Sequence, residues 1–107
     1  MTIELLAEKL KELNEIEEIK NNLYIDEYGY KYLSLENVSK ITPTISTLLY
    51  EIEELARELL ITKEGRNNTS ACLTLKALGY PVVCGQHGSF GWLTGVIILP
   101  NFRYIYG

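Results

Sequence analysis

Carboxylate side chains are missing from the last 43 residues of this 107-residue chain, because all 14 aspartates and glutamates lie between Glu4 and Glu64. The basic residues are divided differently: seven lie in residues 1–64 and three in residues 65–107, so the two parts carry net charges of −7 and +3. A net charge of −4 for the whole chain argues against a nucleic-acid partner. The division of charge indicates that an anionic partner would bind the carboxylate-free part.

The chain also lacks a long apolar run. The longest one, residues 90–99, is about half of the roughly 18 residues that a membrane span needs. No basic segment followed by an apolar stretch opens the sequence, so we expect a cytoplasmic protein with no membrane partner. The two cysteines, Cys72 and Cys84, are then expected to be reduced thiols. Length and an ordinary hydrophobic content of 47% predict a single folded domain over residues 1–107.

Apolar residues at spacings of three and four predict two long helices. The first, over residues 3–20, is capped by Thr2, and its leucine seam allows packing either within the domain or across a homodimer. The second, over residues 43–62, begins with Thr42 as the N-cap and Pro43 at the first helical position. Its wide apolar stripe predicts the central core helix, with an acidic face in solvent.

A polar turn then leads to a short third helix over residues 70–79, with Thr69 or Ser70 as the N-cap and Gly79 as the end. A helix of this length buries one side only. The residues expected on that side are Cys72 or Leu73, Ala77 and Leu78.

Strand-like alternation predicts a hairpin over residues 23–35 with its turn at residues 26–29. Tyr28, Tyr30 and Tyr32 would share one face of this hairpin. Such a row is either a partner-binding interface or the ordinary aromatic content of a half-buried sheet.

Two further strands are expected over residues 81–86 and 90–99, joined by a turn at 86–89, and a short final strand over 102–106. The predicted fold class is therefore α+β. An N-terminal helix and hairpin and the central amphipathic helix form the acidic part, and a short helix and a β-hairpin form the carboxylate-free part.

Enzymatic chemistry is not indicated by any cluster of residues. Cys72, Cys84 and His87 are too few for a structural zinc site, and no carboxylate in the C-terminal part completes the set. No pair of carboxylates and no nucleophile with a nearby base stands at a workable spacing. We therefore expect a non-enzymatic protein without a metal or a cofactor.

An anion site is the clearest candidate in the carboxylate-free part. Residues 66–70 (Arg-Asn-Asn-Thr-Ser) precede or open a helix whose free N–H groups and positive dipole end suit a phosphate. The alternative is simple capping by Thr69 or Ser70 beside an incidental arginine.

The order of these elements resembles a winged helix-turn-helix domain over residues 52–95. Residues 54–60 (ELARELL) look like the first helix of the motif. Residues 75–83 (LKALGYPVV), followed by 88–93 (GSFGWL), look like the end of a recognition helix that runs into a wing. This resemblance implies that helix 70–79 faces the major groove and that the turn at 86–89 touches the DNA backbone.

The sequence thus favours a small DNA-binding regulator, with DNA or another polyanion as its partner. The alternative is an inhibitor or sequestering protein of the phage or mobile-element type, which binds a protein partner or a phosphorylated small ligand. The first hypothesis is weakened by the small number of basic residues available for phosphate contacts, which is four, with Lys76 alone in helix 70–79. The residues predicted to contact nucleic acid or an anion are Arg66, Asn67, Asn68, Thr69, Ser70, Lys76, His87 and Arg103.

Overall fold

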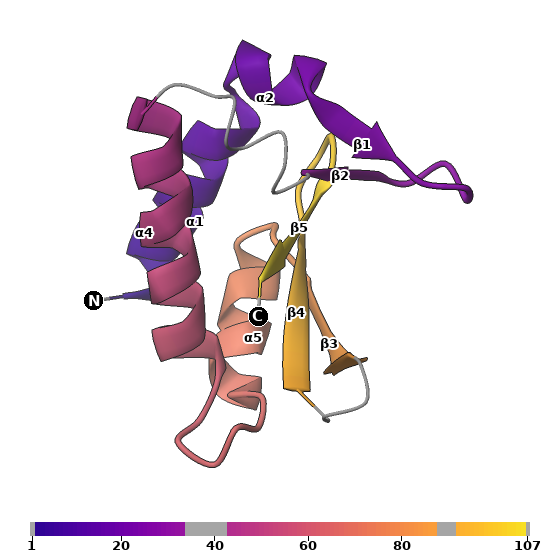
Figure 1. The fold of residues 1–107 in the computed structure, drawn as a ribbon. Helices are drawn as coiled ribbons and strands as arrows, with labels where there is room; N and C mark the ends of the chain where they lie inside the picture. The colour runs from indigo at the N-terminus through magenta and orange to yellow at the C-terminus, as the bar shows by residue number, and fades with distance from the viewer. Residues whose placement is uncertain (1, 34–42, 88–91, 107) are drawn as a thin grey trace.

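The computed structural model describes residues 2–33, 43–87 and 92–106. Within them the chain forms four helices and a five-stranded sheet, which confirms the α+β class (Figure 1). The elements in chain order are α1 (Ile3–Asn14), α2 (Glu17–Asn21), β1 (Leu23–Ile25), β2 (Lys31–Leu33), α4 (Pro43–Leu60), α5 (Thr69–Ala77), β3 (Val82–His87), β4 (Trp92–Ile98) and β5 (Arg103–Tyr106).

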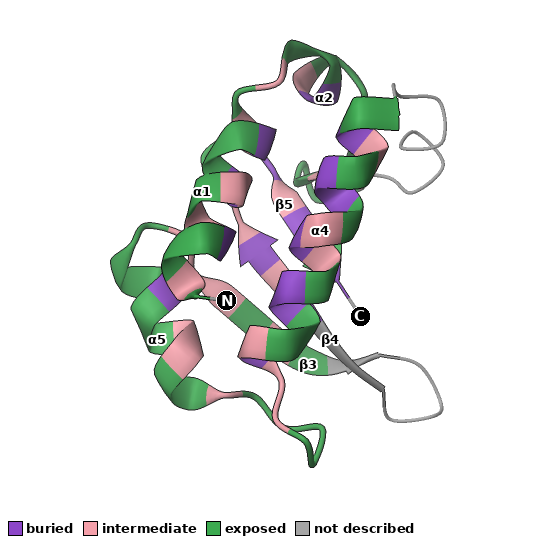
Figure 2. Cartoon of the chain, turned by 90° about the vertical axis from the view of Figure 1, so that its left-hand side faces the viewer, coloured by how far each residue is buried: buried purple, intermediate pink, exposed green. Residues whose placement is uncertain are grey.

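The strand order in the sheet is β1-β2-β5-β4-β3. The neighbours pair antiparallel except β2 and β5, which run parallel and meet at Tyr32 and Arg103. This pairing joins the N-terminal hairpin to the last strand of the chain. Helices α1, α4 and α5 all lie on one side of β3, β4 and β5 (Figures 1 and 2). The two expected hairpins are confirmed by the pairs β1–β2 and β3–β4 and the final strand by β5, whereas residues 34, 35 and 88–91 lie outside the described residues.

The single helix predicted over residues 3–20 is wrong, because the chain breaks between α1 and α2. The Thr2 cap is confirmed by the hydrogen bond that the Leu5 amide donates to its hydroxyl at 3.2 Å. A continuous helix would place Leu13 and Ile19 about 120° apart around its axis. The extended backbone of Ile16 turns the chain between them, and both side chains are fully buried in the core.

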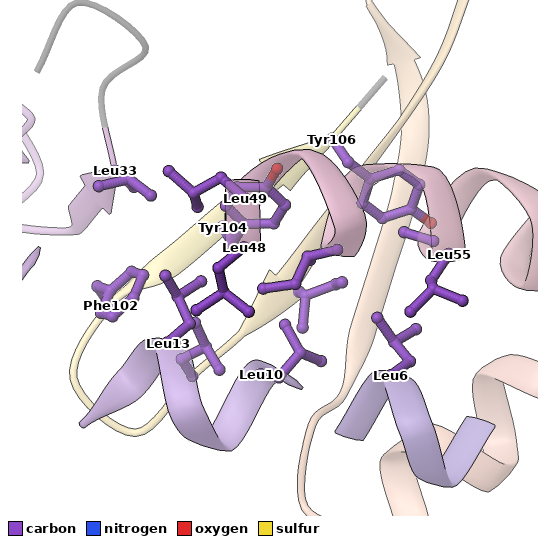
Figure 3. Packing of buried hydrophobic residues seen from close by; sticks show 14 of the residues in the cluster. Leu6, Leu10, Leu13, Leu33, Leu48, Leu49, Leu55, Phe102, Tyr104 and Tyr106 are labelled. Atoms are coloured by element: carbon purple, nitrogen blue, oxygen red, sulfur yellow. The ribbon is translucent and has the colours of Figure 1, made fainter. Parts of the chain in front are cut away.

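The central helix α4 supplies the largest share of the core, as its periodicity predicts, and ends at Leu60 rather than at residue 62. Its predicted cap, Thr42, lies outside the described residues. The apolar side of α4 packs against the leucines of α1 and the inward side chains of β5 (Figure 3). The buried residues of α4 are Ile45, Leu48, Leu49, Ile52, Leu55, Ala56 and Leu60.

Helix α5 differs from the expectation in its cap and in its buried side. Asn68 is the N-cap in place of Thr69 or Ser70: its side-chain oxygen accepts a hydrogen bond from the Ala71 amide at 3.3 Å. Leu75 is the one fully buried residue of α5, while Leu73, Ala77 and Leu78 are exposed. Apolar residues lie around most of this helix, so periodicity does not decide which side packs inward; contact with α1, α4 and β3 selects the stripe of Ala71, Cys72 and Leu75.

Candidate functional site

Helices cover one face of the sheet, and no described helix covers the other. Side chains alternate along each strand, so residues opposite one another on neighbouring strands share a face. On the covered face, toward the helices, the rows are Val82, Ile97 and Tyr104, and Cys84, Gly95 and Tyr106. On the opposite face, which we call the open face, the row is Val83, Val96 and Ile105. Tyr106 is 2% exposed, whereas Val83 is 57% and Ile105 47% exposed.

The open face continues into the N-terminal hairpin. Arg103 of β5 lies opposite Ile98 on one side and Tyr32 on the other. Tyr32 in turn lies opposite Tyr24, which is exposed. One row of side chains, Tyr24, Tyr32, Arg103 and Ile98, therefore crosses four strands of the sheet. The open face is apolar and aromatic along this row, with Arg103 as its one charged member.

A tight turn holds the hairpin in shape. One carboxylate oxygen of Asp26 accepts hydrogen bonds from the amides of Tyr28 and Tyr30, both at 2.9 Å. Gly29 adopts a φ of 83°, a conformation that side chains with a Cβ rarely take. The Arg103 guanidinium lies over the Tyr30 ring, 3.7 Å from its centroid, which fastens the hairpin to β5. The aromatic side chains thus project from a hairpin whose conformation is already fixed.

The predicted row of three tyrosines is partly wrong. Tyr30 and Tyr32 alternate onto the same side, as expected, but Tyr28 lies in the turn and projects from the hairpin tip with 77% of its surface exposed. Tyr24 replaces it in the row, and the sequence reasoning missed it. Counting outward from the predicted turn at residues 26–29 would pair Tyr24 with Lys31. The loop instead closes where the Asp26 amide donates to the Tyr30 carbonyl, and this longer loop pairs Tyr24 with Tyr32.

The basic residues proposed for anion binding do not form one cluster. Arg66 lies in the loop between α4 and α5, Lys76 in the last turn of α5, and Arg103 at the start of β5. Figure 1 shows that loop at the opposite end of the molecule from the junction of β2 and β5. His87 is the last residue of β3, and its side chain lies outside what the structure describes. Arg103 is thus separated from Arg66.

The predicted phosphate loop is largely occupied by its own hydrogen bonds. The Arg66 amide donates to the Thr62 hydroxyl at 3.1 Å, and the Arg66 carbonyl accepts from the Thr62 amide at 2.7 Å. The Asn68 side chain, besides capping α5, donates to the Leu59 carbonyl at 3.2 Å. Asn67, Thr69 and Ser70 are exposed. Anion binding by residues 66–70 stays a prediction. The side-chain amide of Asn68 is already hydrogen-bonded to the Leu59 carbonyl and the Ala71 amide.

Two cysteines and a tyrosine meet on the covered face, a grouping that the sequence did not indicate. The Cys72 thiol of α5 lies within hydrogen-bonding reach of Cys84 on β3. The Cys84 sulfur lies 3.9 Å from the Tyr106 hydroxyl oxygen. Burial raises the pKa of Cys72 and, more strongly, that of Tyr106, and the neighbouring Cys84 raises both further. Burial likewise raises the pKa of Tyr104, helped by the Glu53 carboxylate.

A shallow depression lies where α4 meets β5. Its volume is about 170 Å³, and its lining includes Tyr50, Glu53 and Ile105. Small-molecule sites usually have volumes of about 300–1,000 Å³. A larger groove of about 380 Å³ between α1 and α4 is lined by the ion-paired side chains of Lys9 and Glu51, which satisfy each other's charge. The open face extends across four strands, so it suits a macromolecule rather than a small ligand.

Within residues 2–33, 43–87 and 92–106, no helix is both long and apolar enough to cross a membrane, and no three potential metal ligands of the His, Cys, Asp and Glu types lie together. Comparisons with protein-family models, with curated proteins and with solved structures find no match. Function is therefore inferred from the geometry of this chain alone.

Proposed function

We propose that this chain is a small binding protein that holds a partner protein across the open face and the β1–β2 hairpin. The observation that carries the proposal is the continuous run of apolar and aromatic side chains on a sheet face that no described helix covers. Large contiguous apolar patches are uncommon on soluble monomers and often mark an interaction surface. Antiparallel sheets with one solvated face normally carry polar side chains there.

The composition of the surface favours a protein as the occupant. Tyrosine is enriched at the centres of protein interfaces, where its ring is buried and its hydroxyl reaches a polar partner. Tyr24 and Tyr28 offer such rings at the hairpin, and neither is needed for the core. The Asp26 turn and the contact between Arg103 and Tyr30 hold the hairpin in place before binding, which lowers the entropy lost on association.

The acidic charge of the N-terminal part indicates what kind of partner surface would be complementary to it. Residues 2–33 carry eight carboxylates and four lysines, and the exposed acidic side chains near the hairpin include Glu17, Glu18 and Glu27. A complementary partner presents an apolar surface bordered by lysine or arginine. A second copy of this chain fits less well, because two acidic N-terminal parts and two copies of Arg103 would be brought together. The role that follows is inhibition or sequestration, in which this chain masks a surface that its partner needs.

Site-specific photo-crosslinking tests the surface directly. We would place a photo-crosslinking amino acid at Tyr28, on the hairpin tip, or at Leu73, a residue of α5 with 60% of its surface exposed. In extract of the source cells, the Tyr28 position should yield one dominant crosslinked protein, and the Leu73 control position should not. The captured protein should then bind the purified chain with a Kd that rises at least about tenfold in the double variant Tyr24→Ala, Tyr28→Ala.

Two results would overturn the proposal. Equal crosslinking from Tyr28 and Leu73 would show that the hairpin is not a selective surface. A chain that crosslinks only to itself, and sediments as a dimer that Tyr28→Ala dissociates, would replace the foreign partner with a second copy. Thermal melting of each variant serves as the control, since exposed side chains contribute little to stability.

DNA binding is a second candidate, favoured by one observation. Helices α4 and α5 are followed by the β3–β4 hairpin, which is the order of a winged helix-turn-helix domain. Thr69, Ser70, Thr74 and Lys76 are exposed on α5 and would meet the DNA. Fluorescence anisotropy with a labelled duplex pool at low salt tests this candidate, with Lys76→Ala expected to weaken binding and Lys31→Ala, on the hairpin, as the matched control. No binding at low salt, where phosphate attraction is strongest, would eliminate it.

A further inference from the structure

Packing of α5 on β3 brings together the only two cysteines of the chain. Cys72 lies on the side of α5 that faces the core, and Cys84 lies on the covered face of β3. Both are free thiols and both are half-buried. The chain reverses between them at Gly79, whose φ of 100° ends the helix. Two thiols from separate elements therefore face each other inside the described fold.

The position of each thiol is restricted by its surroundings. Cys84 is paired across the sheet with Gly95, and Gly95 with Tyr106. Because Gly95 has no side chain, the Tyr106 ring lies over it and places its hydroxyl against the Cys84 sulfur. Cys72 is held by the burial of Leu75, one turn further along α5. Burial raises the pKa of the Cys72 thiol and the adjacent Cys84 raises it further, so the thiolate of Cys72 that reacts with a peroxide forms more readily as the pH rises.

We propose that Cys72 and Cys84 form an oxidative modification site, in which a peroxide converts the two thiols into a disulfide that links α5 to β3. One thiolate attacks a peroxide oxygen, the O–O bond breaks, and hydroxide leaves as the sulfenic acid forms. The second thiolate attacks that sulfur, the S–S bond forms, and the S–O bond breaks with loss of hydroxide, which is protonated to water. Two thiols are oxidised and one hydrogen peroxide is reduced to two waters. A small dithiol reductant reverses the change by exchange.

The bridge would join residues 12 apart in sequence and hold the helix against the sheet. A disulfide lowers the conformational freedom of the unfolded chain, so the oxidised protein should melt at a temperature higher by roughly 10 °C. The site lies on the covered face, on the other side of the sheet from the proposed binding surface. The proposed disulfide can therefore be tested independently of partner binding.

The test uses the full chain and hydrogen peroxide in slight excess. Intact mass should fall by two hydrogen atoms per chain, both thiols should disappear together, and a non-reducing peptide map should show one link between the peptides that contain Cys72 and Cys84. Dithiothreitol should restore the mass and the original melting temperature. With dimedone present, wild-type protein should show little sulfenic acid adduct, because the second thiol reacts first.

Cys72→Ser and Cys84→Ser are the matched controls. Each keeps one thiol without its partner, so the variant that retains the peroxide-reactive cysteine should trap dimedone and form no internal bridge. Tyr106→Phe keeps the ring over Gly95 and removes the hydroxyl beside Cys84, and it should still form the bridge. The proposal is overturned by wild-type protein that keeps both thiols, forms only links between chains, or is oxidised at each sulfur separately. A bridge that leaves the melting temperature unchanged would overturn the predicted link between oxidation and stability.

Discussion

The covered and open faces of the sheet are built from similar residues and differ in what lies over them. Strand β5 alternates between Tyr104 and Tyr106, both buried under the helices, and Arg103 and Ile105, which face the other way. Strand β3 begins with Val82 toward the helices and Val83 away from them. A sheet that only had to cover a core would be expected to place polar side chains on its outer face. Under the proposed function, the outer face is apolar because a partner buries it.

The largest expected difference between the faces concerns stability. Tyr106→Ala removes a fully enclosed ring and should lower the free energy of unfolding by about 3–5 kcal/mol. Ile105→Ala, on the adjacent residue of the same strand, should lower it by less than about 1 kcal/mol. Urea denaturation followed by tryptophan fluorescence measures both. Equal losses would mean that the open face is covered in solution, for example by a second copy.

Alkaline pH should destabilise the covered face. Burial raises the pKa values of Tyr104 and Tyr106 above the value of about 10 in an unfolded chain. Above that pH the unfolded state releases protons that the folded state retains, so the contribution of the two tyrosines to stability is constant below about pH 10 and falls above it. The fall should approach about 1.4 kcal/mol per pH unit for each tyrosine, and Cys72 adds to it in the same direction. Denaturation midpoints from pH 8 to 11 measure it, and Tyr106→Phe should remove roughly half of the tyrosine contribution.

Gly85 of β3 and Gly95 of β4 differ in whether they have room for a methyl group. A Cβ added at Gly95 would overlap the Tyr106 ring, whereas one added at Gly85 meets nothing within 4 Å. Gly95→Ala should therefore cost about 1–3 kcal/mol of unfolding free energy, and Gly85→Ala should change it by about 0.5 kcal/mol or less. Thermal melting of the two variants checks the pair. Similar melting temperatures would show that the ring moves aside without cost.

The smallest effect is expected at the hairpin. Arg103→Ala removes the guanidinium over Tyr30, a contact worth about 0.5–1 kcal/mol at an exposed site. The amides of β1 and β2 should then exchange hydrogen about 2–5 times faster, while those of β4 stay unchanged. Lys31→Ala, an exposed cation on the same hairpin, is the control and should leave exchange as it is. Unchanged exchange in Arg103→Ala would show that the backbone ladder alone holds the hairpin.

Local patterns predicted most of the elements. The stripe of α4, the Asp26 turn and the two hairpins each depend on residues close in sequence, so periodicity and turn chemistry were sufficient to find them. The break at Ile16 was missed because the heptad-like spacing continues through it. The buried side of α5 was missed because apolar residues lie on several sides of that helix.

The candidate surface was predicted only in part. Tyr30 and Tyr32 were named from alternation along one strand, but the open face also needs Ile98, Arg103 and Ile105 from segments about 70 residues away in sequence. No local pattern predicts that β2 pairs with β5. Arg103 was assigned to an anion site for its charge alone, whereas in the fold it lies over Tyr30 within an aromatic row.

The sequence by itself determined the α+β class, the central helix and the division between an acidic part and a carboxylate-free part. The tertiary structure decided what that division means. Residues 65–107 supply three strands of the sheet, and two of their three basic side chains, Arg66 and Arg103, lie far apart. The lack of carboxylates there accompanies a sheet with apolar residues on both faces, because a charged side chain is costly to bury in a core or an interface. Which residues met across that sheet depended on long-range strand pairing, which local sequence does not encode.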